Sequence, residues 1–149
     1  MLSGTYSVTI RHRIDGVFDH IADGTRNDSW RGPVIEVSLI AGSGNVGSVW
    51  HQLLRGFGGR PAEADYRVTA FERPHRYAFE LIAGPTLGGG EYTLTEVAPG
   101  TTTVTLVATL RPHGLVPGLT GLVRRHMATE LDGLDRLREL LESAPGGRS

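Results

Sequence analysis

The sequence predicts an α+β fold in which a strongly curved antiparallel sheet wraps one long C-terminal helix. Residues 119–141 place their apolar side chains on one face of about six helical turns. Upstream, segments that alternate polar and apolar residues recur about every ten residues between short turns, which indicates an antiparallel meander. Seven such strands twist rather than stay flat, and the helix covers the curved surface. The apolar helix face comprises Leu119, Leu122, Val123, Met127, Leu131, Leu134, Leu137, Leu140 and Leu141.

The elements before this helix follow from local patterns. Residues 6–14 alternate as a strand with one buried face. Asp15 is expected to cap a short helix that runs to Ala22, and residues 23–31 form a loop or a second short helix. Further strands are expected at 33–39, 47–54, 62–71, 77–82, 92–97 and 104–110, with Gly84-Pro85 and Gly88-Gly89-Gly90 bracketing one turn.

Composition limits the classes of function. The 149 residues fit one domain, residues 1–144, with a frayed tail at 145–149. The net charge of −1 gives no reason to expect nucleic acid binding, and the lack of cysteine excludes disulfides and thiolate metal sites. No stretch is apolar enough to span a membrane or to act as a signal peptide core, so a cytoplasmic protein is expected. All 15 basic residues are arginine, which stays charged even when it is buried.

Two polar residues interrupt the apolar face of the long helix. His126 and Glu130 lie near its middle and are four residues apart, so their side chains can touch. In a functional interpretation, Glu130 orients His126, which serves as a general acid or base. In a structural interpretation, they form a satisfied buried pair, or a pair exposed where the helix overhangs the sheet.

The strands supply further candidates. Tyr66, Tyr77, Phe79 and Tyr92 fall on apolar faces and should point towards the helix, either lining a pocket or packing in the core. The single large apolar residue in 23–31 is Trp30, which either closes a cavity mouth or anchors its loop.

The orientation of the strand at 47–54 is ambiguous. Trp50 and Gln52 share one face, whereas His51 and Arg55 share the other. One polar group, Gln52 or Arg55, therefore enters the interior in either case. No metal or cofactor is expected, because the six histidines lack paired spacing and no nucleotide-binding fingerprint occurs.

Several segments together resemble the START-like, polyketide cyclase/dehydrase and lipid-transport (SRPBCC) superfamily. They are residues 13–15, 17–23, 44–50, 72–76, 90–94 and 99–102, with Asn27, Trp30 and the C-terminal helix. Family members usually place several more residues between the Ile-Asp and Val-Phe pairs, where this chain has only Gly16. We therefore expect the first short helix to be shortened by about one turn.

The resemblance implies a helix-grip fold with a cavity between the sheet and the long helix. The leading hypothesis is a monomer or homodimer that binds a small hydrophobic ligand, lipid-like or polyketide-like. Glycine-rich loops around Gly44, Gly58 and Gly89 would open the cavity mouth, and Glu130→Leu would leave folding intact but change ligand preference. The expected ligand-binding residues are Trp30, Trp50, Gln52, Arg55, Tyr66, Tyr77, Phe79, Tyr92, Val123, His126, Met127 and Glu130.

Two alternatives stay open. One is a polyketide aromatase/cyclase or dehydratase in which His126 transfers the proton with help from Glu130 or Tyr92. The other is an interaction module without a ligand, which an interior filled by Leu and Phe would favour.

Overall fold

The computed structural model describes residues 2–31, 34–55, 60–114 and 119–143. In chain order, its elements are β1 (Leu2–Ile10), α1 (Ile14–Ala22), the 3-10 turn η1 (Gly24–Arg26), α2 (Asn27–Trp30), β2 (Val34–Ala41), β3 (Val49–Arg55), β4 (Pro61–Glu63), β5 (Tyr66–Glu72), β6 (Arg76–Leu81), β7 (Thr86–Ala98), β8 (Thr101–Pro112) and α3 (Leu119–Ser143).

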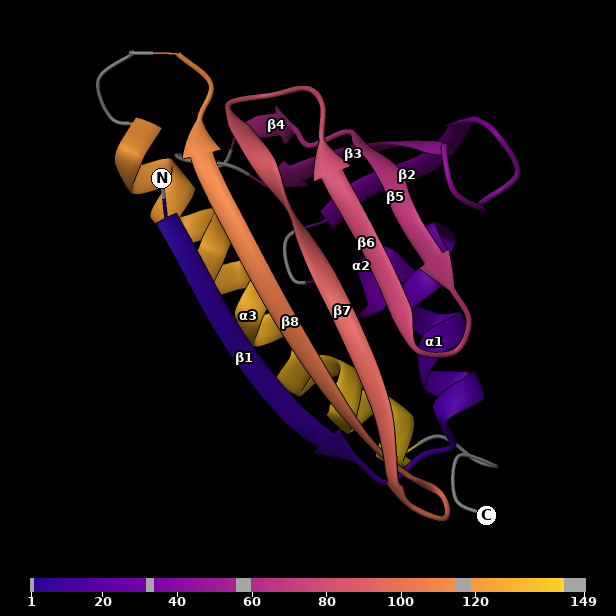
Figure 1. The fold of residues 1–149 in the computed structure, drawn as a ribbon. Helices are drawn as coiled ribbons and strands as arrows, with labels where there is room; N and C mark the ends of the chain where they lie inside the picture. Colours follow the sequence, from indigo (N-terminus) through magenta and orange to yellow (C-terminus); the bar gives the residue numbers. More distant parts are fainter. Residues whose placement is uncertain (1, 32–33, 56–59, 115–118, 144–149) are drawn as a thin grey trace.

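The strands form one antiparallel sheet in the order β1-β8-β7-β6-β5-β3-β2, with the short β4 beside β3 (Figure 1). The predicted α+β architecture is confirmed. The predicted strand at 62–71 is divided into β4 and β5 at Ala64 and Asp65, although both parts pair with β3 in one common register. The backbone N–H of Ala64 donates to the carbonyl of Gln52, and the Asp65 carboxylate accepts from the backbone N–H of Gln52.

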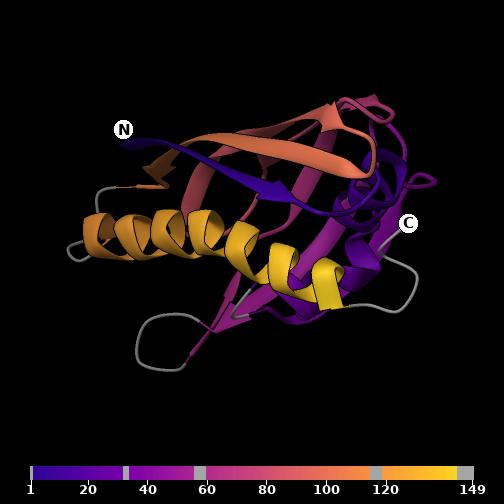
Figure 2. The same cartoon turned by 90° about the horizontal axis from the view of Figure 1, so that it is seen from below.

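The sheet curves over α3, which packs against β1, β8 and β7 (Figure 2). Alternation along β8 produces this contact, because Val104, Leu106 and Leu110 are fully buried on the helix side. Leu134 and Leu137 of α3 are equally buried. Each such side chain contributes about 1.5–3 kcal/mol when it leaves water, so this seam fixes the helix on the sheet.

The three consecutive glycines lie inside a strand and not at a turn. Gly88, Gly89 and Gly90 pair with β6 on one side and with β8 on the other. A Cβ atom at Gly89 would overlap the carbonyl oxygen of Phe79, so glycine allows the two backbones to approach closely. The predicted turn is present at Gly84-Pro85, but its predicted extension to Gly88–Gly90 is wrong, and so is the predicted mobile loop at Gly89.

Gly44 does lie in a turn region, with φ of +104°. The predicted loop at Gly58 and the predicted frayed tail at 145–149 fall outside the described residues.

Two local predictions need correction. The residue that caps α1 is Arg13, which makes no side-chain capping bond, and Asp15 lies within the first turn, where its charge favours the helix dipole. Strand β2 does not bury one regular apolar face. Ile35 and Leu39 are 48% and 40% exposed, because bulges shift the register of β2 on β3 and β2 is the last of the described strands at this edge of the sheet.

Candidate functional site

The short helix α2 ends by placing an arginine inside the protein. Arg31 is only 4% exposed. Its guanidinium carbon lies 4.9 Å from the ring centre of Trp30, 5.1 Å from Phe79, 5.6 Å from Tyr66 and 5.7 Å from Tyr92. We call these four rings the aromatic cage. Its π faces stabilise a cation held away from water, and Nη2 of Arg31 donates a hydrogen bond of 3.3 Å to the Tyr92 hydroxyl.

Glu130 of α3 supplies the opposite charge. It is 7% exposed, and its Oε1 lies 3.2 Å from Nε2 of His126. Burial opposes ionisation of the carboxyl group, but the Arg31 charge and the His126 hydrogen bond together keep the pKa of Glu130 below its ordinary value. Burial likewise opposes the charge of Arg31, yet Tyr92 and Glu130 raise the pKa of its guanidinium. The interior therefore holds a cation and an anion that stabilise each other.

Both charged groups have atoms that no described residue satisfies. Nε and Nη1 of Arg31 and Oε2 of Glu130 are buried, and none of them has a hydrogen-bond partner among the described residues. A buried polar atom left unpaired costs about 1–3 kcal/mol, and proteins normally satisfy such atoms with water or a ligand. The site is thus equipped to hold the polar atom of a non-protein molecule.

A second polar group lies on the same interior. Nδ2 of Asn27 donates to Oε1 of Gln52 at 3.0 Å and to the Tyr66 hydroxyl at 2.7 Å. Gln52 is 1% exposed, so the face of β3 that carries Trp50 and Gln52 points inward, which resolves the orientation that the sequence left open. Arg55 is exposed and lies outside this group.

Trp30 forms part of the interior wall. Its ring packs edge to face on Tyr92 at 5.9 Å between centroids. It also lies against α3 at Gly133, where an added Cβ would come 3.4 Å from the ring. Its complete burial agrees with the interpretation that Trp30 anchors its loop, rather than with the one in which it closes a cavity mouth.

The three interior tyrosines stay protonated. Burial raises the pKa of Tyr66, Tyr77 and Tyr92 above the ordinary phenol value. Each therefore presents a hydroxyl that is able to donate. Among the described residues, no group of three His, Cys, Asp or Glu side chains is placed to hold a metal ion.

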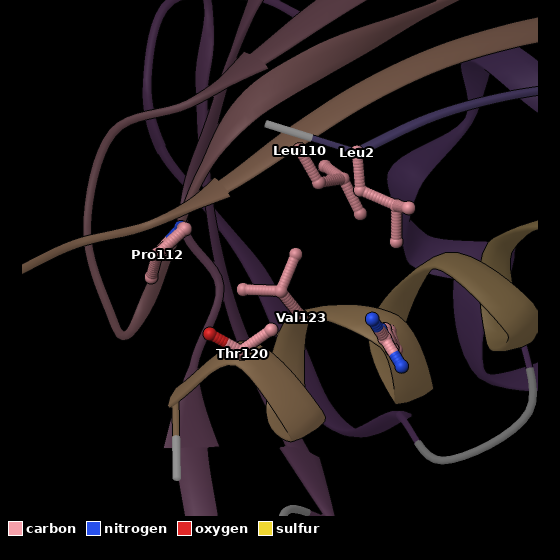
Figure 3. A pocket seen from close by; sticks show the side chains of 6 residues that line it. Leu2, Leu110, Pro112, Thr120 and Val123 are labelled. Carbon is pink, nitrogen blue, oxygen red and sulfur yellow. The ribbon is translucent and has the colours of Figure 1, made fainter. Parts of the chain in front are cut away.

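A pocket of about 190 Å³ opens where α3 begins (Figure 3). Its lining residues are Leu2, Leu110, Pro112, Thr120, Val123 and Arg124. Val123 and Glu130 are seven residues apart on the buried side of α3, which corresponds to about 10 Å along the axis. The buried His126 and Met127 lie between them. Glu130 and the part of α3 that lines the pocket thus lie along the same helix face.

The sequence identified most of the interior but missed its cation. All the predicted ligand-binding side chains except Arg55 are buried or line the pocket. Asn27 and Arg31 were not predicted as site residues. The available signal was an arginine directly after the only large apolar residue of segment 23–31, in a chain whose basic residues are all arginine.

A curved antiparallel sheet that grips a long C-terminal helix defines the helix-grip class of START-like proteins. Residues 1–142 match the family described as polyketide cyclase / dehydrase and lipid transport, and the chain belongs to this family. No curated protein matches the sequence. Among the helices of the described residues, none has the length and apolar character needed to cross a membrane.

Solved structures share the fold at low sequence identity. A START superfamily protein from Mycobacterium smegmatis is 15% identical, with a TM-score of 0.69 over 93% of this chain and 98% of that one. The Zhui aromatase/cyclase from a Streptomyces species is 15% identical, with a TM-score of 0.75 over 99% of both chains. The di-domain ARO/CYC protein BexL is 20% identical, with a TM-score of 0.72 over 97% of this chain and 51% of that one.

Proposed function

We propose that this protein binds a small, largely apolar molecule between the sheet and α3. The observation that carries the proposal is that Arg31 and Glu130 are both buried and have unpaired atoms in a largely aromatic and aliphatic interior. The apolar walls would supply most of the affinity, at roughly 25 cal/mol per Å² of ligand surface removed from water. The charged pair would set the orientation of the ligand.

The chemical class of the ligand is proposed from the family. A lipid-like or polyketide-like molecule agrees with the family description and with relatives that are named as an aromatase/cyclase and as an ARO/CYC protein. The pocket, whose lining includes Leu2, Leu110 and Val123, would accept the less polar part of such a molecule.

Native mass spectrometry of the purified protein, followed by solvent extraction, tests this function. We expect a bound species of defined mass that is lost on denaturation. The matched variant is Arg31→Met combined with Glu130→Leu, which removes both charges together and should retain less of that species. A wild-type protein that carries no small molecule, and whose melting temperature is unchanged by a panel of aromatic and fatty-acid probes, would contradict the proposal.

One observation favours a second candidate, an aromatase/cyclase or dehydratase. His126 is buried and is hydrogen-bonded to Glu130, which suits a general base whose imidazolium form is stabilised by a carboxylate. His126 would remove a proton from the carbon between two carbonyls of a polyketide-like chain. The resulting enolate would attack a further carbonyl, and His126 would return the proton to the new alkoxide.

His126→Ala separates the two candidates. For an enzyme, turnover is lost while ligand affinity survives, because the aromatic cage and Arg31 remain. For a carrier, the wild type returns its ligand unreacted. A ligand-free interaction module receives little support, because the interior contains Arg31 and Glu130 rather than Leu and Phe alone.

A further inference from the structure

The pocket at the start of α3 combines an apolar surface with two polar residues on one side of the helix. Leu2, Leu110 and Val123 point towards one another across it (Figure 3). Thr120 and Arg124 line the same space, and their spacing of four residues puts both on one side of α3. The pocket therefore offers an apolar surface beside a hydroxyl group and a guanidinium group.

Arg124 brings a positive charge that the described residues leave without a counter-charge. Its side chain is exposed, and no described residue forms an ion pair with it. The positions three and four residues away on α3 are Thr120, Gly121, Met127 and Ala128, none of which is acidic. The first turn of α3 has no acidic residue either, and the positive end of the helix dipole lies at this end of α3. An anionic group is therefore favoured at the mouth of the pocket.

The pocket is small, and the space narrows towards the middle of α3. Its volume of about 190 Å³ slightly exceeds that of an apolar protein cavity of about 150 Å³ that binds benzene, and is below the roughly 300–1,000 Å³ of sites for drug-sized ligands. A Cβ atom at Gly4, two residues beyond Leu2, would come 3.0 Å from Sδ of Met127, so β1 lies close against α3 there. The pocket by itself thus accepts one ring or a short alkyl chain.

We propose that this pocket binds a small carboxylic acid, with one ring or a short alkyl chain among Leu2, Leu110 and Val123 and with the carboxylate at the mouth beside Arg124. This inference rests on the proposed function, because it names the chemical class that binds in one part of the space between the sheet and α3. The Thr120 hydroxyl is a further donor for the same carboxylate. The carboxylate keeps its contact with water at the mouth, so little desolvation opposes its pairing with Arg124.

The apolar contacts determine that a ligand binds, and Arg124 determines which ligand binds best. Because an exposed ion pair is weak, the charge should change affinity by only about two- to fivefold at low ionic strength. A neutral alcohol of the same shape loses this contribution, and an ammonium group is repelled by the guanidinium. The preference should also fall as salt screens the charges.

Three matched probes test the inference on the wild-type protein. They are 3-phenylpropanoate, 3-phenylpropan-1-ol and 3-phenylpropan-1-amine, which share a ring and a chain and differ in the terminal group. Nuclear magnetic resonance titration of the methyl groups of Leu2, Leu110 and Val123 gives each dissociation constant and locates the probe. The acid should bind about two- to fivefold more tightly than the alcohol, and the amine should bind most weakly. The advantage of the acid should shrink when the salt concentration rises from about 0.01 M to about 1 M.

Variants assign the preference to Arg124. Arg124→Gln should remove the advantage of the acid over the alcohol, whereas Arg136→Gln, an exposed arginine of α3 outside the pocket lining, should keep it. Val123→Phe places a larger side chain in the pocket and should abolish the methyl shifts caused by all three probes.

Equal affinity of the wild type for acid and alcohol, or a preference that survives Arg124→Gln, overturns the inference. Methyl groups of Leu2, Leu110 and Val123 that do not respond to any probe overturn it as well. Native mass spectrometry separates this failure from that of the proposed function. A small molecule retained by the wild type, together with no binding of these probes, counts against the carboxylic acid site alone.

Discussion

Glu130 of α3 is the buried counter-charge of Arg31, the residue that directly follows α2. The negative charge lowers the free energy of a guanidinium that the aromatic cage alone would hold in a medium of low polarity. Because the two residues are about 100 positions apart in the sequence, their interaction also ties the segment before β2 to the C-terminal helix.

Glu130→Leu should therefore destabilise the fold, in contrast to the expectation from sequence alone. Loss of the carboxylate leaves Arg31 buried without its counter-charge, which costs about 3–5 kcal/mol of unfolding free energy. Adding Arg31→Met should recover most of that loss, because an apolar pair of similar volume needs no counter-charge. Urea denaturation of the wild type, the two single variants and the double variant gives the interaction free energy between residues 31 and 130. Additive effects of the two substitutions would show that the charges do not interact.

His20 should make the protein less stable in weak acid. Its Nε2 lies 3.2 Å from the Ser29 hydroxyl, and burial, followed by the nearby Arg26 charge, lowers the pKa of His20 to about 4. The unfolded chain binds this proton near pH 6.5, before the folded chain does. Stability is thus fully present above about pH 6.5 and falls as the pH approaches 4, by roughly 2 kcal/mol.

His20→Gln should flatten this part of the stability curve, measured by denaturant titration between about pH 7 and pH 4. His113→Gln is the control, because this exposed histidine is not among the groups that shift the pKa of His20. An unchanged slope in His20→Gln would mean that other groups cause the acid sensitivity.

His51 should have the opposite effect at higher pH. Its Nε2 lies 3.0 Å from the carboxylate of Glu36 and its Nδ1 lies 2.9 Å from that of Asp65. The hydrogen bond to Glu36, helped by Asp65, raises the pKa of His51 above its ordinary value. Its contribution to stability is therefore complete below about pH 6.5 and is lost as the pH rises through the folded-state pKa.

Glu36→Gln tests this assignment, because it removes the main cause of the shift while keeping the size of the side chain. The decrease in unfolding free energy from about pH 6 to pH 9 should be smaller in this variant than in the wild type. Nuclear magnetic resonance titration of the His51 ring should show a lower pKa in Glu36→Gln. The same titration midpoint in both proteins would contradict the prediction.

Gly89→Ala should be strongly destabilising although Gly89 lies in a regular strand. Its added methyl group would meet the backbone of Phe79, which has no rotamer to move into, and overpacking of this kind costs about 1–3 kcal/mol or more. Gly44→Ala is the comparison, because its Cβ meets nothing within 4 Å and only the φ of +104° is strained. Thermal unfolding should show a larger loss for Gly89→Ala, and equal losses would argue against a close approach at β7.

Sequence patterns predicted those parts of the molecule whose structure is decided by periodicity. The alternation along residues 104–110 and the apolar face of 119–141 reflect burial at fixed spacing, and both became elements of the predicted type. His126 and Glu130 were predicted to touch for the same reason, and they do. Gly88–Gly90 misled because glycine marks close backbone approach inside a strand as well as a turn.

The interior cation could not be predicted in this way. Arg31 follows a helix of only four residues, so no repeat indicates which way its side chain points. Its burial depends on contacts with Tyr66, Phe79 and Tyr92, which come from three different strands. Such a position is a property of the assembled fold and has no local pattern.

Asn27 lies in α2 and Arg31 directly follows it, so part of the interior chemistry comes from a segment outside the main frame of the protein. The sheet and α3 pack together and form the frame of the protein. The side chains of Asn27 and Arg31, by contrast, enter the interior from a segment of a few residues that is part of neither the sheet nor α3. Substitutions confined to Asn27–Arg31 should therefore change which ligand the interior binds while every strand pairing is retained. For protein engineering, residues 27–31 are therefore a segment that can be redesigned as a unit. Residue 130 on α3 would have to be chosen so that its charge complements the new segment.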